Sequence, residues 1–99
     1  MTIDRVEFTV DAADELDELV EYIDARNSDA ARRVRRDVMG AVARLASEVP
    51  RLDGRPVTLQ SGDRCLRWFV HPVVVFYERE PGVVRVLRVL HHAREPITR

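Results

Sequence analysis

The stretch from Asp63 to Glu95 constrains the fold most, because its residues predict strands joined by short turns. Valine, leucine and aromatic residues fill three runs, Leu66–Val70, Val73–Tyr77 and Val83–Leu90, and residues of these types favour a pleated, buried surface. Proline and glycine between the second and third runs suit a tight reversal of the chain. Three consecutive strands with short connections are predicted to pair as an antiparallel sheet.

The pair His71-Pro72 separates the first two of these strands. In a two-residue loop, the favoured primed turns need a positive φ at the first loop position, which histidine disfavours. The alternatives are a wider loop or a cis proline in a type VI turn, and we expect the cis proline least.

The last of the three strands is apolar on both faces. If side chains alternate along it, one face holds Val84, Val86, Arg88 and Leu90, and the other holds Val83, Arg85, Leu87, Val89 and His91. Such a strand is predicted to lie in the centre of the sheet and to be covered on both sides. An arginine on each face of it requires a carboxylate, solvent or an anionic ligand.

The N-terminal half predicts one strand followed by two helices. Arg5–Val10 alternates apolar and polar residues, which indicates a strand with one covered face. Ala12–Ala25 and Ala30–Glu48 carry apolar residues at helical spacing, and the short break between them predicts an antiparallel hairpin. Asp11 is predicted to cap the first helix, and Asn27-Ser28-Asp29 to end it and to cap the second.

Residues 50–63 predict a loop with a candidate short strand at Val57–Leu59. A loop this long is unusual in so small a domain, so we expect a functional or partner-binding segment. The predicted order is β-α-α-β-β-β in one domain, residues 1–99. It is an α+β fold in which an antiparallel αα-hairpin packs on one face of a mostly antiparallel twisted sheet. We expect the other face to show arginines and histidines around a groove.

Composition limits the class of protein. The sequence has no apolar run long enough to span a membrane, and its start lacks the basic and apolar regions of a signal peptide. A single cysteine, Cys65, excludes an internal disulfide, and together these features predict a cytoplasmic protein. Residues 1–49 carry seven arginines and 12 acidic residues, and residues 50–99 carry nine and five, so the halves have net charges of −5 and +4. This split predicts a cationic strand region beside an acidic helix.

Two clusters of side chains are candidates for chemistry. His91 and His92 are adjacent in a strand and point to opposite faces, so they do not form a metal-binding pair, and no metal or other cofactor is predicted. One of them could act as a general acid or base beside arginines, or both could belong to a solvent-exposed strand end. Convergence of four arginines with His91 would suit a phosphate backbone or an acidic partner: Arg64, Arg67, Arg88 and Arg94.

A third cluster, at the start of the second helix, has two interpretations. Arg32, Arg33, Arg35 and Arg36 could bind nucleic acid or form salt bridges with the acidic first helix, and we favour the salt bridges. The aromatic residues of the sheet are predicted to be core or half-core residues: Trp68, Phe69, Phe76 and Tyr77. Cys65 is predicted to be a packed thiol.

Several short motifs are spread over nearly the whole chain. They are Asp11-Ala12-Ala13-Asp14-Glu15-Leu16 and Tyr22-Ile23 after the first strand, Arg44-Leu45 before Pro50, Gly54-Arg55-Pro56, Leu66-Arg67 leading to Val75-Phe76-Tyr77, and Arg88-Val89-Leu90-His91-His92-Ala93-Arg94-Glu95. With these motifs the chain resembles the RelE/ParE superfamily of toxins from type II toxin–antitoxin systems, and more closely its ParE branch. The last motif is the most specific.

The resemblance implies a function. ParE-like toxins are associated with poisoning of DNA gyrase, and RelE-like toxins with ribosome-dependent cleavage of messenger RNA. This chain has no lysine, no tyrosine after Glu95 and a net charge of −1, which favours the gyrase target over a nuclease. A RelE/YoeB-like endoribonuclease is the alternative, because a late histidine is kept. A degenerate, non-toxic antitoxin-binding module is the third possibility.

The resemblance also implies a partner, a ParD-like antitoxin that lays an extended or helical segment across the toxin. A homodimer or a heterotetramer with the antitoxin is possible, and no membrane is involved. Candidate residues for antitoxin binding are Leu16, Leu19, Val20, Arg67, Arg88 and Arg94. Candidates for target contact are His91, His92 and Arg94, and a nuclease would use His91, His92, Arg64 and Arg67.

Overall fold

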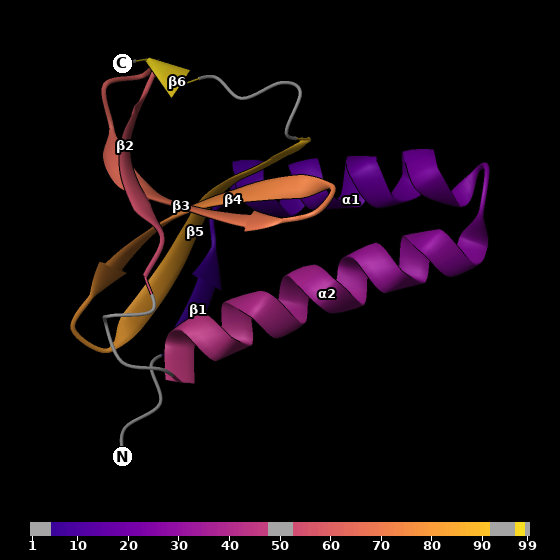
Figure 1. Cartoon of the computed structure of the whole chain (residues 1–99), viewed down its shortest axis with the longest axis horizontal. Helices are drawn as coiled ribbons and strands as arrows, with labels where there is room; N and C mark the ends of the chain where they lie inside the picture. Colours follow the sequence, from indigo (N-terminus) through magenta and orange to yellow (C-terminus); the bar gives the residue numbers. More distant parts are fainter. Residues whose placement is uncertain (1–4, 48–52, 92–96, 99) are drawn as a thin grey trace.

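The computed structural model describes residues 5–47, 53–91 and 97–98. Within them the chain forms two helices and six strands (Figure 1). In chain order they are β1 (Arg5–Phe8), α1 (Val10–Asp24), α2 (Ser28–Ser47), β2 (Arg55–Leu59), β3 (Arg64–Val70), β4 (Val73–Glu80), β5 (Val83–His91) and β6 (Ile97–Thr98). The predicted α+β fold, with a helical hairpin on a mostly antiparallel sheet, is confirmed. The expected loop before the sheet contains a full strand, β2.

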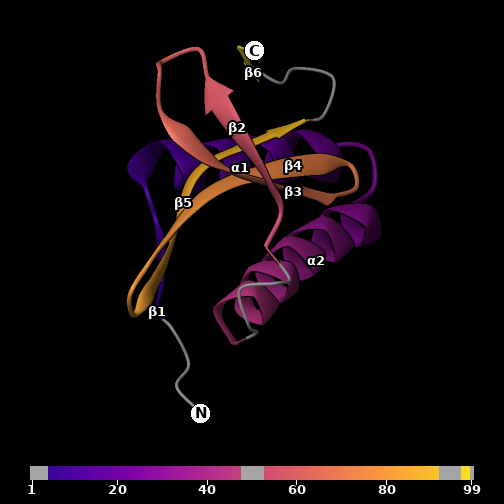
Figure 2. The ribbon, with the colours of Figure 1, turned by 60° about the vertical axis from the view of Figure 1, so that its left-hand side comes forward.

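The strands form one sheet in the order β1-β5-β4-β3-β2-β6. All neighbours are antiparallel except β1, which pairs in parallel with the first half of β5. The predicted central position of β5 is therefore confirmed, with β1 on one side and β4 on the other. Figure 2 shows how strongly the sheet twists between β1 and β2.

A bulge in β5 changes which side chains share a face. Phe76 pairs with Arg88, but the next residue, Tyr77, pairs with Val86, so Leu87 is an extra residue. The predicted regular alternation along β5 is therefore wrong beyond Val86. Val84, Val86 and Val89 lie in the core under the helices, and Leu87 and Leu90 pack on the other face.

The main core lies between the helical hairpin and the sheet. Leu16 of α1 and Leu45 of α2 are 3% and 2% exposed, as their helical spacing predicted. Valines and a tyrosine of the sheet complete this core: Val73, Val75, Tyr77, Val84, Val86 and Val89. Trp68 packs against it from β3. The core therefore holds both helices to one face of the sheet.

The opposite face of the sheet has a smaller core of its own. Leu59, Cys65, Val74 and Phe76 are buried there, and Leu87 and Leu90 pack against them. Residues of β2 can meet residues of β5 only because the sheet curls across β4 and β3. An open groove of arginines and histidines on this face was therefore the wrong expectation, since apolar side chains fill its centre.

Thr9, not Asp11, caps α1. Its Oγ1 accepts a hydrogen bond from the Ala12 N–H at 3.1 Å, and the same hydroxyl donates to the Leu87 carbonyl at 2.9 Å. The strand before it ends at Phe8, two residues earlier than predicted. Asn27 caps α2, because its Oδ1 accepts from the Ala30 N–H at 3.0 Å.

The loop between β3 and β4 contains only His71 and Pro72, because Val70 pairs with Val73. The peptide bond between the two loop residues is cis, the arrangement of a type VI turn. Our expectation that the cis proline was the least favoured alternative was therefore wrong.

Candidate functional site

Glu15 of α1 binds the edge of β5 beyond the point where its pairing with β1 ends. Its carboxylate accepts hydrogen bonds from Arg88 Nε at 2.9 Å and from the Val89 backbone N–H at 3.0 Å. The hydrogen bonds from Arg88 to Glu15 are the main reason that the pKa of the guanidinium is raised. The carboxylate that an arginine on this strand requires is thus supplied by the protein itself.

A groove of about 390 Å³ lies beside this edge, between α1 and the end of β5. Its apolar lining comes from Leu19, Tyr22, Val89 and Leu90, and its polar lining from Glu15, Glu18 and His91. Tyr22 is 61% exposed, and the Arg26 guanidinium carbon lies 4.2 Å from the centroid of its ring. A partly apolar groove with an exposed aromatic side chain is suited to receive a segment of another protein.

The residues predicted to bind an antitoxin are spread over several places. Leu19 lines the groove beside β5, whereas Val20 lines a different groove, between α1 and α2. Leu16 is 3% exposed, so no partner can contact it in this conformation. Arg88 is bound to Glu15, and Arg67 lies on β3. Arg94, also predicted to contact the target, is outside the described residues.

The groove between the helices has a volume of about 710 Å³ and carries the arginine cluster of α2. Arg35 bonds to Asp17 of α1 at 2.9 Å, and Arg32 forms an ion pair with Asp29 in its own helix. The predicted salt bridge between the helices is therefore confirmed for Arg35. Arg33 makes no ion pair within the described part of the chain.

The residues predicted for a nuclease do not converge. Val70 of β3 pairs with Val73, which pairs with His91, so His91 is level with the end of β3. Arg64 is the first residue of β3, six residues before Val70, which corresponds to about 20 Å along the strand. Arg67 is level with Phe76 and Arg88, part of the way between. His92 is outside the described residues.

A polar cluster that the sequence did not predict joins α2, the following loop and β4. Arg79 Nε donates to both carboxylate oxygens of Asp53, at 3.0 and 3.1 Å, and its Nη2 donates to the Leu45 carbonyl at 2.9 Å. The Tyr77 hydroxyl donates to Asp53 at 3.1 Å and accepts from the Gly54 N–H at 2.8 Å. Burial is the main cause that raises the pKa of Tyr77 to about 12. The only sequence signal was the position of Asp53-Gly54 in a long loop.

Gly54 also touches β3. A Cβ atom at this position would lie 1.8 Å from the backbone oxygen of Arg67, so only glycine fits. The motif Gly54-Arg55-Pro56 therefore has a structural reason: the chain must pass close to β3 before β2 begins.

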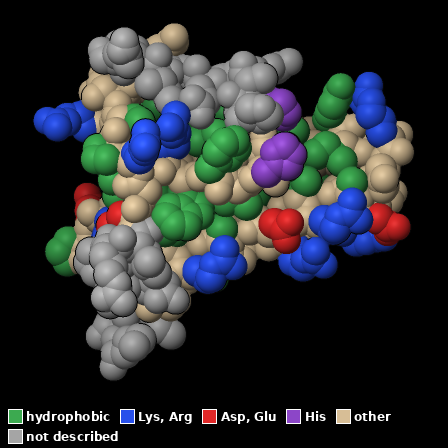
Figure 3. Space-filling model, viewed as in Figure 1, with side chains coloured by type: hydrophobic (Ala, Val, Ile, Leu, Met, Phe, Trp, Pro, Cys, Tyr) green, Lys and Arg blue, Asp and Glu red, His purple; other side chains and the backbone are tan. Residues whose placement is uncertain are grey.

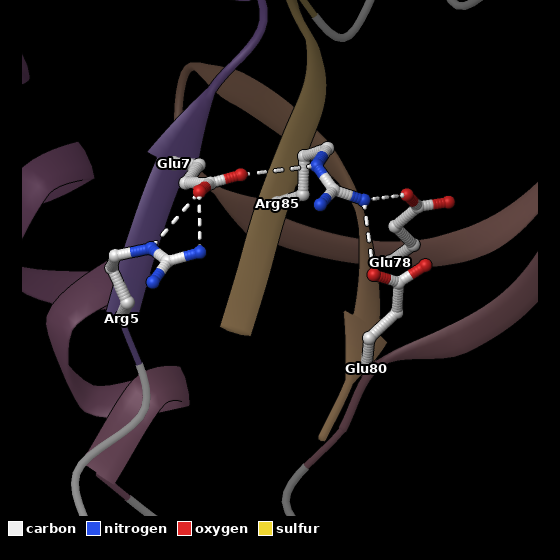
Figure 4. A network of polar contacts seen from close by, with 5 residues as sticks. All are labelled: Arg5, Glu7, Glu78, Glu80 and Arg85. Carbon is white, nitrogen blue, oxygen red and sulfur yellow. Dashed lines mark hydrogen bonds and ion pairs between the residues drawn. The ribbon is translucent and has the colours of Figure 1, made fainter. Parts of the chain in front are cut away.

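A second polar network crosses the sheet near the turn between β4 and β5 (Figure 4). Arg85 bonds to Glu7 of β1 at 3.2 Å and to Glu78 of β4, and Arg5 bonds to Glu7 at 2.8 Å. The hydrogen bond from Arg5, followed by that from Arg85, lowers the pKa of Glu7. The network supplies carboxylates for Arg85 of β5 and holds β1 beside β5.

The structure gives no sign of a metal centre or a reactive thiol in its described part. No three histidine, cysteine, aspartate or glutamate side chains there are placed to hold a metal ion. Cys65 is buried, as predicted, and burial raises the pKa of its thiol to about 11. None of the described helices is both long enough and apolar enough to cross a membrane.

The fold and the sequence both resemble those of known toxin–antitoxin proteins. It matches a solved structure described as "Chromosomal ParDE TA system from P. aeruginosa", with a TM-score of 0.73 and 16% identity, over 90% of this chain and 96% of that chain. At that identity the match establishes a shared α+β fold. Residues 6–96 also match the family model "ParE toxin of type II toxin-antitoxin system, parDE". The chain belongs to this ParE toxin family, and membership implies an antitoxin partner. No curated protein matches the chain significantly.

Proposed function

We propose that this toxin inhibits DNA gyrase by binding and trapping the cleaved enzyme–DNA complex, and that a ParD-like antitoxin neutralises it in the cytoplasm. The match of residues 6–96 to the ParE toxin family carries the proposal. The toxin performs no covalent chemistry of its own in this mechanism. It acts by stabilising one state of its target, which requires only differential binding.

The sheet register supports a mechanism without catalysis. Arg64 and His91 lie at opposite ends of the sheet, separated by about 20 Å along the strand direction. A general acid or base must come within hydrogen-bond distance of the proton it transfers, and an arginine that stabilises the same transition state must lie equally close. These two side chains cannot serve one reacting phosphate in this fold.

The groove between α1 and β5 is the proposed antitoxin site. Leu19, Tyr22 and Leu90 offer apolar surface to an antitoxin side chain, and His91 and Glu18 offer polar contacts at the rim. The groove lies at the edge of β5, so a bound segment could follow that strand. Arg67 lies away from this groove, because it pairs with Phe76, which is buried on the sheet face opposite the helices.

Two assays on the purified toxin test the target. The first measures supercoiling by gyrase and the double-strand breaks released when the trapped complex is denatured. The second measures translation of a defined messenger RNA and maps cleavage in the ribosomal A site. We expect trapped breaks and intact messenger. Cleaved messenger with normal gyrase would establish the endoribonuclease alternative, and inactivity in both assays would indicate a non-toxic antitoxin-binding module.

A further inference from the structure

The side of α2 that faces away from the core is basic. The buried residues of α2, such as Val38, lie on one side of the helix. Because a helix has 3.6 residues in each turn, Arg32, Arg33 and Arg36 lie on the opposite side. Arg44 follows Arg33 by about three turns, so it lies there too. All four arginines are exposed, and this outward face of α2 extends over about 18 Å of the helix.

Ion pairs with α1 account for little of the charge on α2. The first helix carries seven acidic residues and no basic residue, and α2 carries five arginines and two aspartates, a net charge of +3. Within the described residues, Arg35 with Asp17 is the one ion pair that joins the two helices. Figure 3 shows basic side chains spread along α2, at the lower right of the view, with acidic side chains among them. The outward face therefore keeps an excess of positive charge.

The arginines of the outward face are paired weakly or not at all. Arg32 and Arg36 form ion pairs only with aspartates of α2 itself, and every side chain in these pairs is more than half exposed. Exposed pairs of this kind contribute little to stability. Arg33 and Arg44 form no ion pair with any described residue. Their guanidinium groups are therefore available to an anionic ligand.

A glycine at the centre of the outward face has no role in packing. Gly40 lies in the interior of α2, and a Cβ atom at this position would meet no atom within 4 Å. Glycine inside a helix lowers its stability relative to alanine, so the fold alone would favour another residue here. Ala43, the next residue on this face, is also small and is exposed. A ligand can therefore approach the helix closely between the arginines.

We propose that the outward face of α2 binds the phosphate backbone of double-stranded DNA. Guanidinium groups suit phosphates, and a helix holds them at a fixed spacing, which suits the regular backbone of a duplex. Single strands are bound by aromatic side chains that stack on the bases, and α2 has no aromatic residue. An interface with an acidic protein has an apolar centre, whereas the centre of this face is Gly40 and Ala43. Direct contact with DNA deepens the proposed function, on which its role in the toxin rests, because a trapped gyrase complex contains a cleaved duplex.

Fluorescence anisotropy tests the proposal with a labelled duplex of about 20 base pairs, two turns of the double helix, in about 50 mM salt. We expect binding, and Arg33→Gln and Arg44→Gln should each weaken it about ten-fold, because one counterion fewer is released from the DNA. Each variant should also reduce the slope of log K against log salt by about 0.9, the value for one phosphate contact with B-DNA. Neither variant breaks an ion pair between described residues, and circular dichroism should show that both are folded.

Gly40→Gln tests the close approach of the DNA to the helix. Glutamine adds no charge and favours a helix over glycine, but its side chain would stand between α2 and the phosphates. The affinity for the duplex should therefore fall several-fold while the fold is kept. Unchanged affinity in this variant would overturn the proposal.

Arg55→Gln is the matched control for the loss of one arginine charge. Arg55 is exposed, and it pairs with Arg67, which lies on the sheet face opposite the helices. This variant should leave both the affinity and the salt dependence unchanged. Equal losses in Arg33→Gln and Arg55→Gln would overturn the proposal, since they would reflect only the overall charge of the protein.

Two further results with the unchanged toxin would also overturn it. One is absence of duplex binding at about 100 μM toxin, the weak limit of non-specific binding. The other is tighter binding to labelled oligothymidylate than to the duplex. The gyrase assay separates this proposal from the proposed function. A toxin that binds duplex DNA through α2 but traps no breaks would refute gyrase inhibition alone, and trapped breaks without duplex binding would refute the DNA contact alone.

Discussion

Gly54→Ala should strongly destabilise the protein, because the added methyl group has no room beside β3. The new Cβ atom would lie 1.8 Å from the Arg67 carbonyl oxygen and 2.6 Å from the carbonyl carbon. Contacts of a Cβ atom shorter than 3.0 Å essentially do not occur, so the backbone must move by about 1.2 Å at one side of this contact. Neither partner is a flexible side-chain end, so the movement cannot be local.

The magnitude has two parts. Overpacking of this kind costs about 1–3 kcal/mol. The movement also breaks the hydrogen bond from the Gly54 N–H to the Tyr77 hydroxyl, now 2.8 Å, which adds about 1 kcal/mol. The free energy of unfolding should therefore fall by about 2–4 kcal/mol, and the melting temperature of a domain this size by roughly 10–30 °C.

Gly40→Ala provides the control with the same chemical change. Gly40 lies inside α2, and a Cβ atom there would meet no atom within 4 Å. Because alanine favours the helix over glycine, this variant should be more stable by up to about 1 kcal/mol. Urea unfolding of both variants, followed by circular dichroism, measures the two changes. Equal or same-sign effects would falsify the proposed close approach of residue 54 to β3.

Three further predictions follow from the contacts described. Glu15→Gln keeps an acceptor for the Val89 N–H but removes the negative charge opposite Arg88. The free energy of unfolding should therefore fall by about 1 kcal/mol at low salt, and by less at high salt, where the ion pair is screened. A loss that does not change with salt in urea titrations would contradict the ion pair. Folding raises the pKa of Cys65 from 9.0 to about 11 and that of Tyr77 from 10.0 to about 12, so the folded state holds these protons more tightly than the unfolded state. Stability should be complete below about pH 9 and fall as pH rises towards 12, and Tyr77→Phe should reduce the slope above pH 10 in thermal scans. Leu19→Glu places a charge in the groove beside β5, so the affinity for the antitoxin, measured by calorimetry, should fall at least ten-fold, about 1.4 kcal/mol. Met39→Glu, in the groove between the helices, should leave the affinity unchanged. The reverse result would place the antitoxin site on the helical hairpin.

The sequence predicted those parts of the fold that depend on local periodicity. Leu16 and Leu45 belong to the helically spaced apolar residues of α1 and α2, and both are buried as that spacing predicted. The valine-rich runs became β3, β4 and β5 with boundaries close to those expected. These elements are determined by residues near them in the chain, so a single sequence is sufficient to find them.

The features that escaped prediction all depend on distant partners. The bulge at Leu87 is defined by its pairing with β4, and Thr9 caps α1 while its hydroxyl binds the Leu87 carbonyl, 78 residues away. Phe69 alternates like a core residue, but its side chain is 61% exposed. Asp53 binds Arg79, 26 residues later in the chain. No periodicity within a segment encodes such contacts, so the candidate site was predicted by residue type and not by position.

The parallel pairing of β1 with β5 has a consequence for the making of the protein. Arg5 donates its N–H to the Gly82 carbonyl at 2.8 Å, so the first described strand can pair only with a strand that is synthesised much later. Contacts between such distant segments slow folding. A nascent chain that lacks β5 has no strand with which β1 can pair. Its helices also lack Val84, Val86 and Val89, which belong to the core beneath them. Folded toxin therefore cannot form until β5 has been synthesised, which leaves time for an antitoxin made in parallel to be present when folding ends.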